Sequence, residues 1–184
     1  MVNIIWRWEA VEELKPIYED EVECPVCGGK TLKYSVYTYV VPLAGEVVME
    51  VWKCGVCGYR KSNVGLAGVG KAKRLKISVN TDRELRALVI KSSTARIEIP
   101  ELGIEVVPGP AAEGYITTVE GVLEKILDNM PSECFNESHE CHNVVVKIVD
   151  AMNAKLKFTL ILEDPLGRSA LVGENVPIVE EPLT

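Results

Sequence analysis

The sequence has few histidines and phenylalanines and no long run of uncharged residues. Only two of its 184 residues are His and two are Phe. Its longest uncharged stretch, residues 34–45, is 12 residues long, too short for a helix that crosses a bilayer. Residues 1–20 lack the charged region, apolar block and small-residue cleavage site of a secretory signal. We therefore expect a cytoplasmic protein with no membrane partner and with reduced thiols.

Size and charge limit the fold and the partners. A chain of this length accommodates one ordinary domain and a small one, and 47% hydrophobic residues are enough for a core. The net charge of −7 argues against nucleic acid as the main partner. Residues 1–20 form an N-terminal segment in which residues 9–14 are a candidate short helix, and Trp6 and Trp8 are expected to pack on the domain.

Four cysteines form two Cys-x-x-Cys pairs, Cys24 with Cys27 and Cys54 with Cys57. Two such pairs on tight turns supply four thiolates in a tetrahedron, the closed geometry of structural zinc. Glycines follow both pairs and allow the backbone to bend around the sulfurs. Four free thiols or two disulfides are the alternatives. The paired spacing favours one structural Zn²⁺ per chain.

The segment between the two pairs has the pattern of a β-hairpin. Runs rich in β-formers over residues 31–41 and 46–53 flank a turn at residues 42–45. Pair, strand, turn, strand and pair together predict a zinc ribbon over residues 21–64. Tyr37 and Tyr39 share one face of the first strand, and either partner binding or core packing explains them.

Residues 65–72 are rich in glycine and resemble a phosphate-binding loop only in part. Gly65, Gly70 and Lys71 have the required offsets, but Ala72 stands where Ser or Thr should hold Mg²⁺. We expect no strand of its own before this segment, and a strand rather than a helix after it. We interpret it as a hinge between the ribbon and a second domain at residues 73–184.

The second domain has mostly β patterns. Alternation or β-formers predict strands at residues 75–79, 96–99, 103–107, 156–162 and 169–172, the last as a returning strand after a turn at residues 164–167. Residues 82–90 fit a short helix or a strand. The tail from Glu174 is expected to run along the surface.

A helical hairpin is expected within this domain, at about residues 117–153. Thr117 and Glu120 have the spacing of a capping box, an apolar stripe follows, and Pro131 ends the helix. The second arm, residues 142–153, is ambiguous, because its β-branched run favours a strand while its position favours a helix.

A second cluster holds the remaining cysteines and both histidines: Cys134, His139, Cys141 and His142. It could be a second metal site, a disulfide or a loop with free thiols. A thiol–imidazole nucleophile has no orienting third group here, and nearby acids raise a thiol pKa. The four ribbon thiolates leave zinc no open position for catalysis. We predict a non-enzyme.

Several motifs resemble those of the ZPR-type zinc-finger family. They are residues 91–95 with 99–105, residues 114–121 and residues 163–169, and the ribbon precedes them as in that family. Arg168 stands where the family's closing turn has Asn. The resemblance covers roughly residues 21–175.

This resemblance implies a mainly β fold: a four-Cys zinc ribbon, then a double-stranded β-helix, or jelly-roll-like, domain with an inserted α-helical hairpin. Eukaryotic members carry two such modules and bind translation elongation factor one-alpha. The chain is similar to the single-module form of archaea. The resemblance implies that it binds that factor as a folding chaperone or regulator.

The alternative is a zinc-ribbon RNA-binding protein of translation or transcription. Its support is the basic run at residues 71–76. The ribbon itself, residues 21–62, carries five basic and four acidic side chains and so has no marked basic face.

Overall fold

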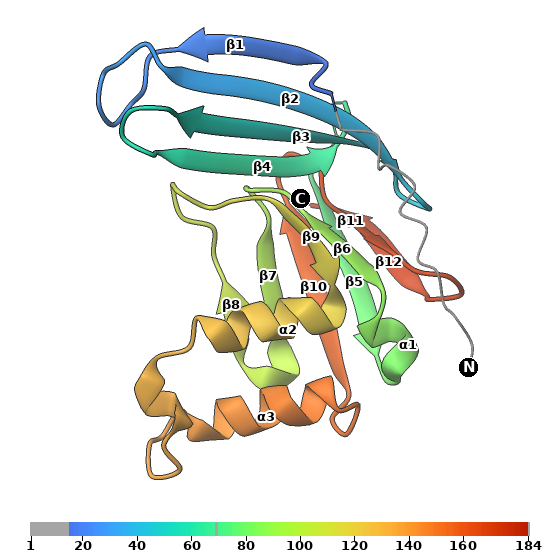
Figure 1. Cartoon of the computed structure of the whole chain (residues 1–184). Coiled ribbons are helices and arrows are strands. Elements are labelled where there is room, and N and C mark those ends of the chain that lie inside the picture. The colour runs from blue at the N-terminus through green and yellow to red at the C-terminus, as the bar shows by residue number, and fades with distance from the viewer. Residues whose placement is uncertain (1–14, 69, 184) are drawn as a thin grey trace, which may run out of the picture.

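A computed structural model describes residues 15–68 and 70–183. Twelve strands and three helices of these residues form three antiparallel sheets and a helical hairpin (Figure 1). The strands are β1 Tyr18–Val22, β2 Leu32–Val41, β3 Gly45–Cys54, β4 Arg60–Leu66, β5 Lys73–Val79, β6 Leu88–Lys91, β7 Arg96–Ile99, β8 Ile104–Val106, β9 Tyr115–Thr118, β10 Phe158–Asp164, β11 Ala170–Val172 and β12 Ile178–Pro182. The helices are α1 Asp82–Leu85, α2 Val119–Asp128 and α3 His142–Met152.

The ribbon is a four-stranded sheet in the order β1-β2-β3-β4. The predicted hairpin is confirmed: β2 and β3 pair from Leu32 opposite Cys54 to Val41 opposite Gly45. The turn between them holds Leu43 and Gly45 at positive φ, a conformation that suits glycine. The outer strands β1 and β4 were not predicted, because β1 is exposed and mostly acidic and β4 begins with four polar residues. Trp6, Trp8 and the expected helix at residues 9–14 lie outside the described residues.

The second domain is a jelly-roll of two facing sheets. One sheet has the order β12-β5-β10-β7-β8 and the other β11-β6-β9. A core of fully buried aliphatic side chains lies between them, including Ile77, Val89, Ile97 and Leu160. The expected fold class, mainly β with a ribbon, a jelly-roll and an inserted helical hairpin, is confirmed.

The hairpin consists of α2 and α3, which lie side by side at the end of the jelly-roll away from the ribbon (Figure 1). Residues 142–152 are helical, so the arm that was ambiguous from sequence is a helix. Its Val145, Ile148 and Ala151 are buried at helical spacing, and this amphipathic face decides against a strand.

The predicted cap of α2 is wrong by one residue. Thr118, not Thr117, is the N-cap, and its hydroxyl accepts the N–H of Gly121 at 3.0 Å. Pairing of β9 with β6 continues to Thr118, opposite Leu88, which delays the helix start. The capping box of the structure is in α1, where Thr81 and Glu84 bond each other's backbone N–H.

The strand after the turn at residues 164–167 belongs to the other sheet. The turn is present, with the Gly167 N–H donating to the Asp164 carbonyl at 3.1 Å. However, β10 pairs with β5 and β7, whereas β11 crosses to the other sheet and pairs with β6. The C-terminal residues 178–182 form edge strand β12 beside β5 instead of a plain surface segment.

The ribbon docks on the jelly-roll through one face and the edge of β4. Val41, Val47 and Val64 of the ribbon and Ile90 and Ala170 of the jelly-roll form a shared buried cluster. At the β4 edge the Leu66 N–H donates to the Arg168 carbonyl at 2.7 Å, and Arg168 Nε donates to the Leu66 carbonyl at 3.2 Å.

The glycine-rich segment at residues 65–72 connects the two parts. Contrary to expectation a strand precedes it, since Gly65 and Leu66 end β4, and β5 follows as expected. A Cβ on Gly70 would lie 2.3 Å from the carbonyl oxygen of Gly167, so the two backbones meet here. Within the described residues no helix has the length and apolar character to cross a membrane.

Candidate metal centre and binding surfaces

The ribbon knuckles bring the sulfurs of Cys24, Cys27, Cys54 and Cys57 within 4.8 Å of one another. Cys24 Sγ lies 3.6 Å from Cys57 Sγ, and Cys27 Sγ lies 3.7 Å from Cys54 Sγ. A tetrahedron with Zn–S bonds of about 2.3 Å has edges of roughly 3.8 Å. The sulfurs therefore stand at the spacing that a zinc ion requires.

Local backbone geometry forms each knuckle. Gly28 and Gly58 have φ of 71° and 73°, which lets the chain turn back after each cysteine pair. The Gly28 N–H donates to the Cys24 carbonyl at 2.8 Å, and the Cys54 N–H donates to the Tyr59 carbonyl at 2.8 Å. Among the described residues, the buried cluster at this end of the ribbon is small and consists of Cys24, Leu32 and Cys54, so a bound metal ion would supply much of the local stability.

The thiols are arranged for a cation. The pKa of Cys54 is lowered to about 6. The backbone N–H of Cys57 is the largest cause, and the Thr31 hydroxyl and the backbone N–H of Val56 add to it. At Cys57 the backbone N–H of Tyr59 favours the thiolate, but burial and the neighbouring sulfurs outweigh it and raise the pKa to about 12. Four sulfurs this close cannot all ionise without a compensating positive charge, which a bound Zn²⁺ would provide.

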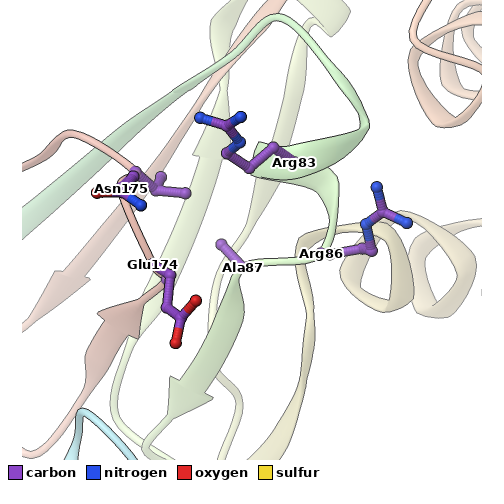
Figure 2. Close-up of a pocket in the computed structure, with 7 residues that line it drawn as sticks. Arg83, Arg86, Ala87, Glu174 and Asn175 are labelled. Atoms are coloured by element: carbon purple, nitrogen blue, oxygen red, sulfur yellow. The ribbon is translucent and has the colours of Figure 1, made fainter.

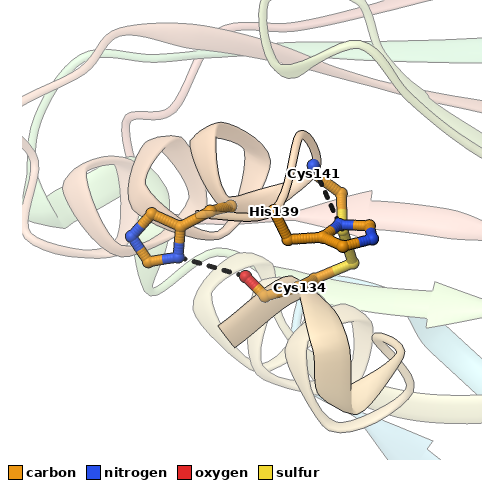
Figure 3. The surroundings of a disulfide bond; sticks show 4 residues. Cys134, His139 and Cys141 are labelled. Carbon is orange, nitrogen blue, oxygen red and sulfur yellow. Dashed lines mark hydrogen bonds between the residues drawn. A yellow bond between two sulfur atoms is a disulfide. The ribbon is translucent and has the colours of Figure 1, made fainter. Parts of the chain in front are cut away.

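The second cysteine cluster lies at the tip of the hairpin, between α2 and α3. Cys134 and Cys141 form a disulfide, and His139 Nδ1 lies 2.8 Å from Cys141 Sγ (Figure 3). His142 is not part of this group, because its Nδ1 faces the carbonyl oxygen of Cys134 at 3.1 Å. Of the four residues grouped from the sequence, three converge.

A buried polar network joins two of the sequence motifs, and sequence reasoning missed it. Asp164 is fully buried, and its carboxylate accepts from the hydroxyls of Ser92, Thr94 and Ser169 and from the N–H groups of Leu166 and Ser169. Burial alone would raise the pKa of Asp164, but these donors outweigh it and lower the pKa below its ordinary value. The network is structural, because all its members lie in the interior or in the turn at residues 164–167.

Comparison with known proteins identifies this architecture. Residues 83–182 match the model of the ZPR1 jelly-roll domain. The chain belongs to the ZPR1 family. It is similar to an uncharacterized ZPR1-like protein of Methanocaldococcus jannaschii, with 37% identity over 84% of this chain and 81% of that protein. A ZPR1-like protein of Pyrococcus horikoshii is 36% identical over 90% of this chain and 79% of its own length.

Eukaryotic ZPR1 proteins are matched over only part of their length. The zinc finger chaperone zpr1 of Schizosaccharomyces pombe is 30% identical over 74% of this chain but 32% of that protein. The human zinc finger protein ZPR1 is 26% identical over 78% of this chain and 33% of its own length. This ZPR1-family chain thus spans about a third of its eukaryotic relatives. Together with their names, the four-cysteine cluster supports zinc binding.

The ribbon of this ZPR1 module carries an aromatic cluster that the sequence analysis did not single out. Tyr34 stacks on Trp52 with ring centroids 5.0 Å apart, and Tyr18 meets Tyr34 edge-on at 6.0 Å. Tyr39 lies on the opposite sheet face and packs half-buried against the cluster shared with the jelly-roll. Binding of a partner through Tyr37 and Tyr39 stays a prediction.

An apolar groove of about 920 Å³ lies between the hairpin and the edge of the larger jelly-roll sheet. Its apolar lining includes Ile97, Ile104, Val106, Ile126, Met130 and Val144. A smaller hollow of about 330 Å³ lies at the ribbon edge, lined by Trp52, Lys53, Arg60 and Lys61. Glu113 lines both, and its carboxylate accepts the Ser62 N–H at 3.0 Å. The groove and the ribbon edge are therefore parts of one continuous surface.

A further hollow of about 480 Å³ lies beside α1. Figure 2 shows that Arg83 and Arg86 point away from each other, with Glu174 on a third side. Because the two guanidinium groups do not converge, this hollow lacks the paired cations of an anion site.

The side chain of Tyr115 lies between two lysines at the groove. Lys91 Nζ and Lys125 Nζ stand 5.6 Å and 5.0 Å from its ring centroid. Burial raises the pKa of Tyr115 to about 12. Burial also lowers the pKa of Lys91, although the charge of Asp164 opposes this shift.

Proposed function

We propose that this ZPR1 module binds translation elongation factor one-alpha and acts as its folding chaperone or regulator. The observation that carries the proposal is the continuous surface from the ribbon edge through Glu113 to the apolar groove. The name of the S. pombe relative, a zinc finger chaperone, supports a chaperone role, and the partner is the one that the sequence resemblance implies.

The groove suits an apolar segment of a partly folded client. Val106, the last residue of β8, lines the groove and is 36% exposed, and Val107, just past the strand, is 64% exposed. Among the described residues, edge strand β8 pairs with β7 alone, so its other side can accept an added strand. Exposed apolar surface beside an open strand edge is the chemistry by which a chaperone holds an extended segment.

The ribbon end of this surface suits an acidic group of the client. Lys33, Lys53 and Arg60 lie directly opposite one another across β2, β3 and β4. Lys33 bonds Glu19 at 2.7 Å, whereas Lys53 and Arg60 have no ion pair within the described residues. Like charges in direct register repel each other, and a bound carboxylate would relieve that repulsion.

The cluster of four thiolates is proposed to hold one structural zinc ion per chain. Four thiolates complete the coordination sphere, so that ion would have no open position for water activation. We accordingly propose a binding protein that works in the cytoplasm rather than an enzyme.

The test is calorimetry of the zinc-loaded chain with elongation factor one-alpha of the same organism, first with GDP and then with a GTP analogue. Binding that differs between the two nucleotide states supports a nucleotide-sensing chaperone or regulator. Absence of binding in both states would reject the elongation factor as client.

Variants locate the binding surface. Val106→Asp places a charge at the groove in edge strand β8 and should weaken binding by about 2 kcal/mol, the cost of a hot-spot change. The matched control is Val179→Asp in β12, the opposite edge strand of the same sheet, where the valine is 50% exposed. Equal losses in both variants would rule out the groove.

RNA binding, the alternative, loses its main support in the structure. In the basic run at residues 71–76, Arg74 Nε bonds Glu163 at 2.7 Å, Lys76 bonds Glu181 at 2.8 Å and Lys73 lies 3.6 Å from Glu180. Neighbouring strands thus neutralise these side chains. RNA affinity that falls steeply with salt would restore this alternative.

A further inference from the structure

We propose that Cys134, His139 and Cys141 form a second metal site for a thiophilic ion such as Zn²⁺, which becomes available when their disulfide is reduced. This site is separate from the ribbon cluster, and its metal content can be measured without the elongation factor. The hairpin tip is then cross-linked in one of two ways, by the disulfide in the oxidised chain or by a metal ion in the reduced chain.

The ligand atoms already converge. The sulfurs of Cys134 and Cys141 and one ring nitrogen of His139 lie within 4.8 Å of one another. Figure 3 shows the His139 ring beside the disulfide, with Cys134 on the segment before the loop and Cys141 at the start of the next helix. Two thiolates and an imidazole are preferred ligands of Zn²⁺.

The hydrogen bonds of His139 present the correct nitrogen. The Cys141 N–H donates to His139 Nδ1 at 3.4 Å, so Nδ1 is the unprotonated nitrogen, and it lies 2.8 Å from Cys141 Sγ. A metal ion would take over the lone pair that accepts this N–H. A neutral imidazole with a free lone pair is the form that ligates metal. His142 is held elsewhere by the Cys134 carbonyl at 3.1 Å, which makes His142 a matched control.

The loop is short and internally bonded, which limits the ligand motion that metal binding requires. Asn136 accepts the Ser138 N–H at its side chain (3.1 Å) and the His139 N–H at its carbonyl (3.0 Å). The His142 N–H donates to the His139 carbonyl at 3.0 Å. These bonds hold His139 beside the two cysteines in addition to the disulfide.

The site lies partly inside the protein. Cys134 is 3% exposed, and both cysteines line the apolar groove. An apolar environment strengthens the attraction between thiolate and cation. One coordination position stays open for water or an added ligand, since three protein atoms are offered.

The redox step balances with a dithiol as reductant. The dithiol gives two electrons and two protons to the Cys134–Cys141 bond, which becomes two thiols, and the dithiol becomes a disulfide. Zn²⁺ then replaces the two thiol protons, which are released to solvent. In the reverse direction, an organic disulfide takes two electrons from the metal-bound pair, which becomes the Cys134–Cys141 bond and releases the ion, and two protons from solvent complete the resulting dithiol.

The test is zinc content by native mass spectrometry after loading and desalting, in chain reduced with a phosphine and in oxidised chain. We expect about two zinc ions per reduced chain and about one per oxidised chain, because only the ribbon site survives oxidation. An equal count in both states would overturn the proposal.

Single variants separate the metal site from the disulfide. His139→Ala leaves both thiols intact and should weaken binding of the second zinc ion by more than about tenfold. Removal of a direct ligand costs at least as much metal affinity as removal of a group that orients a ligand. His142→Ala should keep the second ion. Cobalt loading gives an independent spectrum for a two-sulfur site. Retention of the second ion in His139→Ala, with helix content unchanged by circular dichroism, would refute the assignment.

Discussion

The hydroxyl of Ser169 donates a 2.6 Å hydrogen bond to the buried carboxylate of Asp164. The same hydroxyl accepts the N–H of Ser92 at 3.0 Å. This pair therefore fastens the end of β10 to the loop after β6, and so connects the two sheets of the jelly-roll. Ser92, Asp164 and Ser169 belong to the motifs that resemble those of the family, and in the structure they stabilise the fold.

Replacement of the Asp164 carboxylate should be strongly destabilising. Asp164→Ala leaves the hydroxyls of Ser92, Thr94 and Ser169 and two backbone N–H groups without their acceptor. We expect a loss of roughly 3 kcal/mol or more in the free energy of unfolding, measured by denaturant titration. Asp128→Ala, an exposed carboxylate at the end of α2, is the control and should change it by less than about 0.5 kcal/mol.

The same residue makes stability depend on acid pH. Its pKa is lowered in the folded chain, so its contribution is complete above the ordinary value of 3.8 and is lost as pH falls through the lower, folded pKa. In Asp164→Asn this part of the acid transition should disappear from a pH series of unfolding curves. An acid limb identical to that of the native chain would contradict the network.

Gly114 should not tolerate a methyl group. A Cβ there would lie 2.5 Å from the backbone nitrogen and 2.6 Å from the carbonyl oxygen of Val64, where the jelly-roll meets the ribbon edge. Gly114→Ala should cost about 1–3 kcal/mol by denaturant titration. Gly109→Ala is the matched control in the same loop, because no atom lies within 4 Å of its Cβ. Equal stability of the two variants would argue against this docking.

Metal removal should unfold the ribbon from its knuckle end. Chelation, or Cys54→Ser, should remove the metal ion and so destabilise the small cluster around Leu32. Val47 and Val64 should stay packed on the jelly-roll. Amide hydrogen exchange should show loss of protection near Leu32 first and near Val47 last. Cys141→Ser lies outside the cluster and should leave ribbon exchange unchanged. Uniform loss across the ribbon would contradict this order.

Tyr115 should titrate late and weaken the fold at alkaline pH. Its pKa of about 12 lies above the ordinary value of 10.0, so the folded state favours the neutral phenol. Stability is unaffected below pH 10 and falls between the two values, because the unfolded chain releases the proton first. Tyr115→Phe should remove one late component from the ultraviolet tyrosinate titration and flatten this loss. An unchanged titration would contradict burial of the ring.

Local patterns predicted local structure well in this chain. The β2–β3 hairpin and helix α2 were predicted correctly, because each pattern involves residues that are close together in the sequence. The cap of α2 was misplaced because strand pairing at Leu88 reaches Thr118, and this long-range contact overrides a spacing rule. The sequence did not decide between a strand and a helix for residues 142–152, because β-branched residues fit either a strand or a buried helix face. Packing against the core decides for the helix.

The sequence alone determined the ribbon and the four-cysteine cluster at its knuckles, because four cysteines in two closely spaced pairs have few other arrangements that satisfy their chemistry. It also determined the family, since the motifs occur in order. Only the tertiary structure decided that β11 leaves β10 for β6, that Asp164 collects its donors from distant segments, and that His139 rather than His142 joins Cys134 and Cys141. These depend on contacts between residues far apart in the chain or on the direction of single side chains, and neither leaves a periodic signal in the sequence.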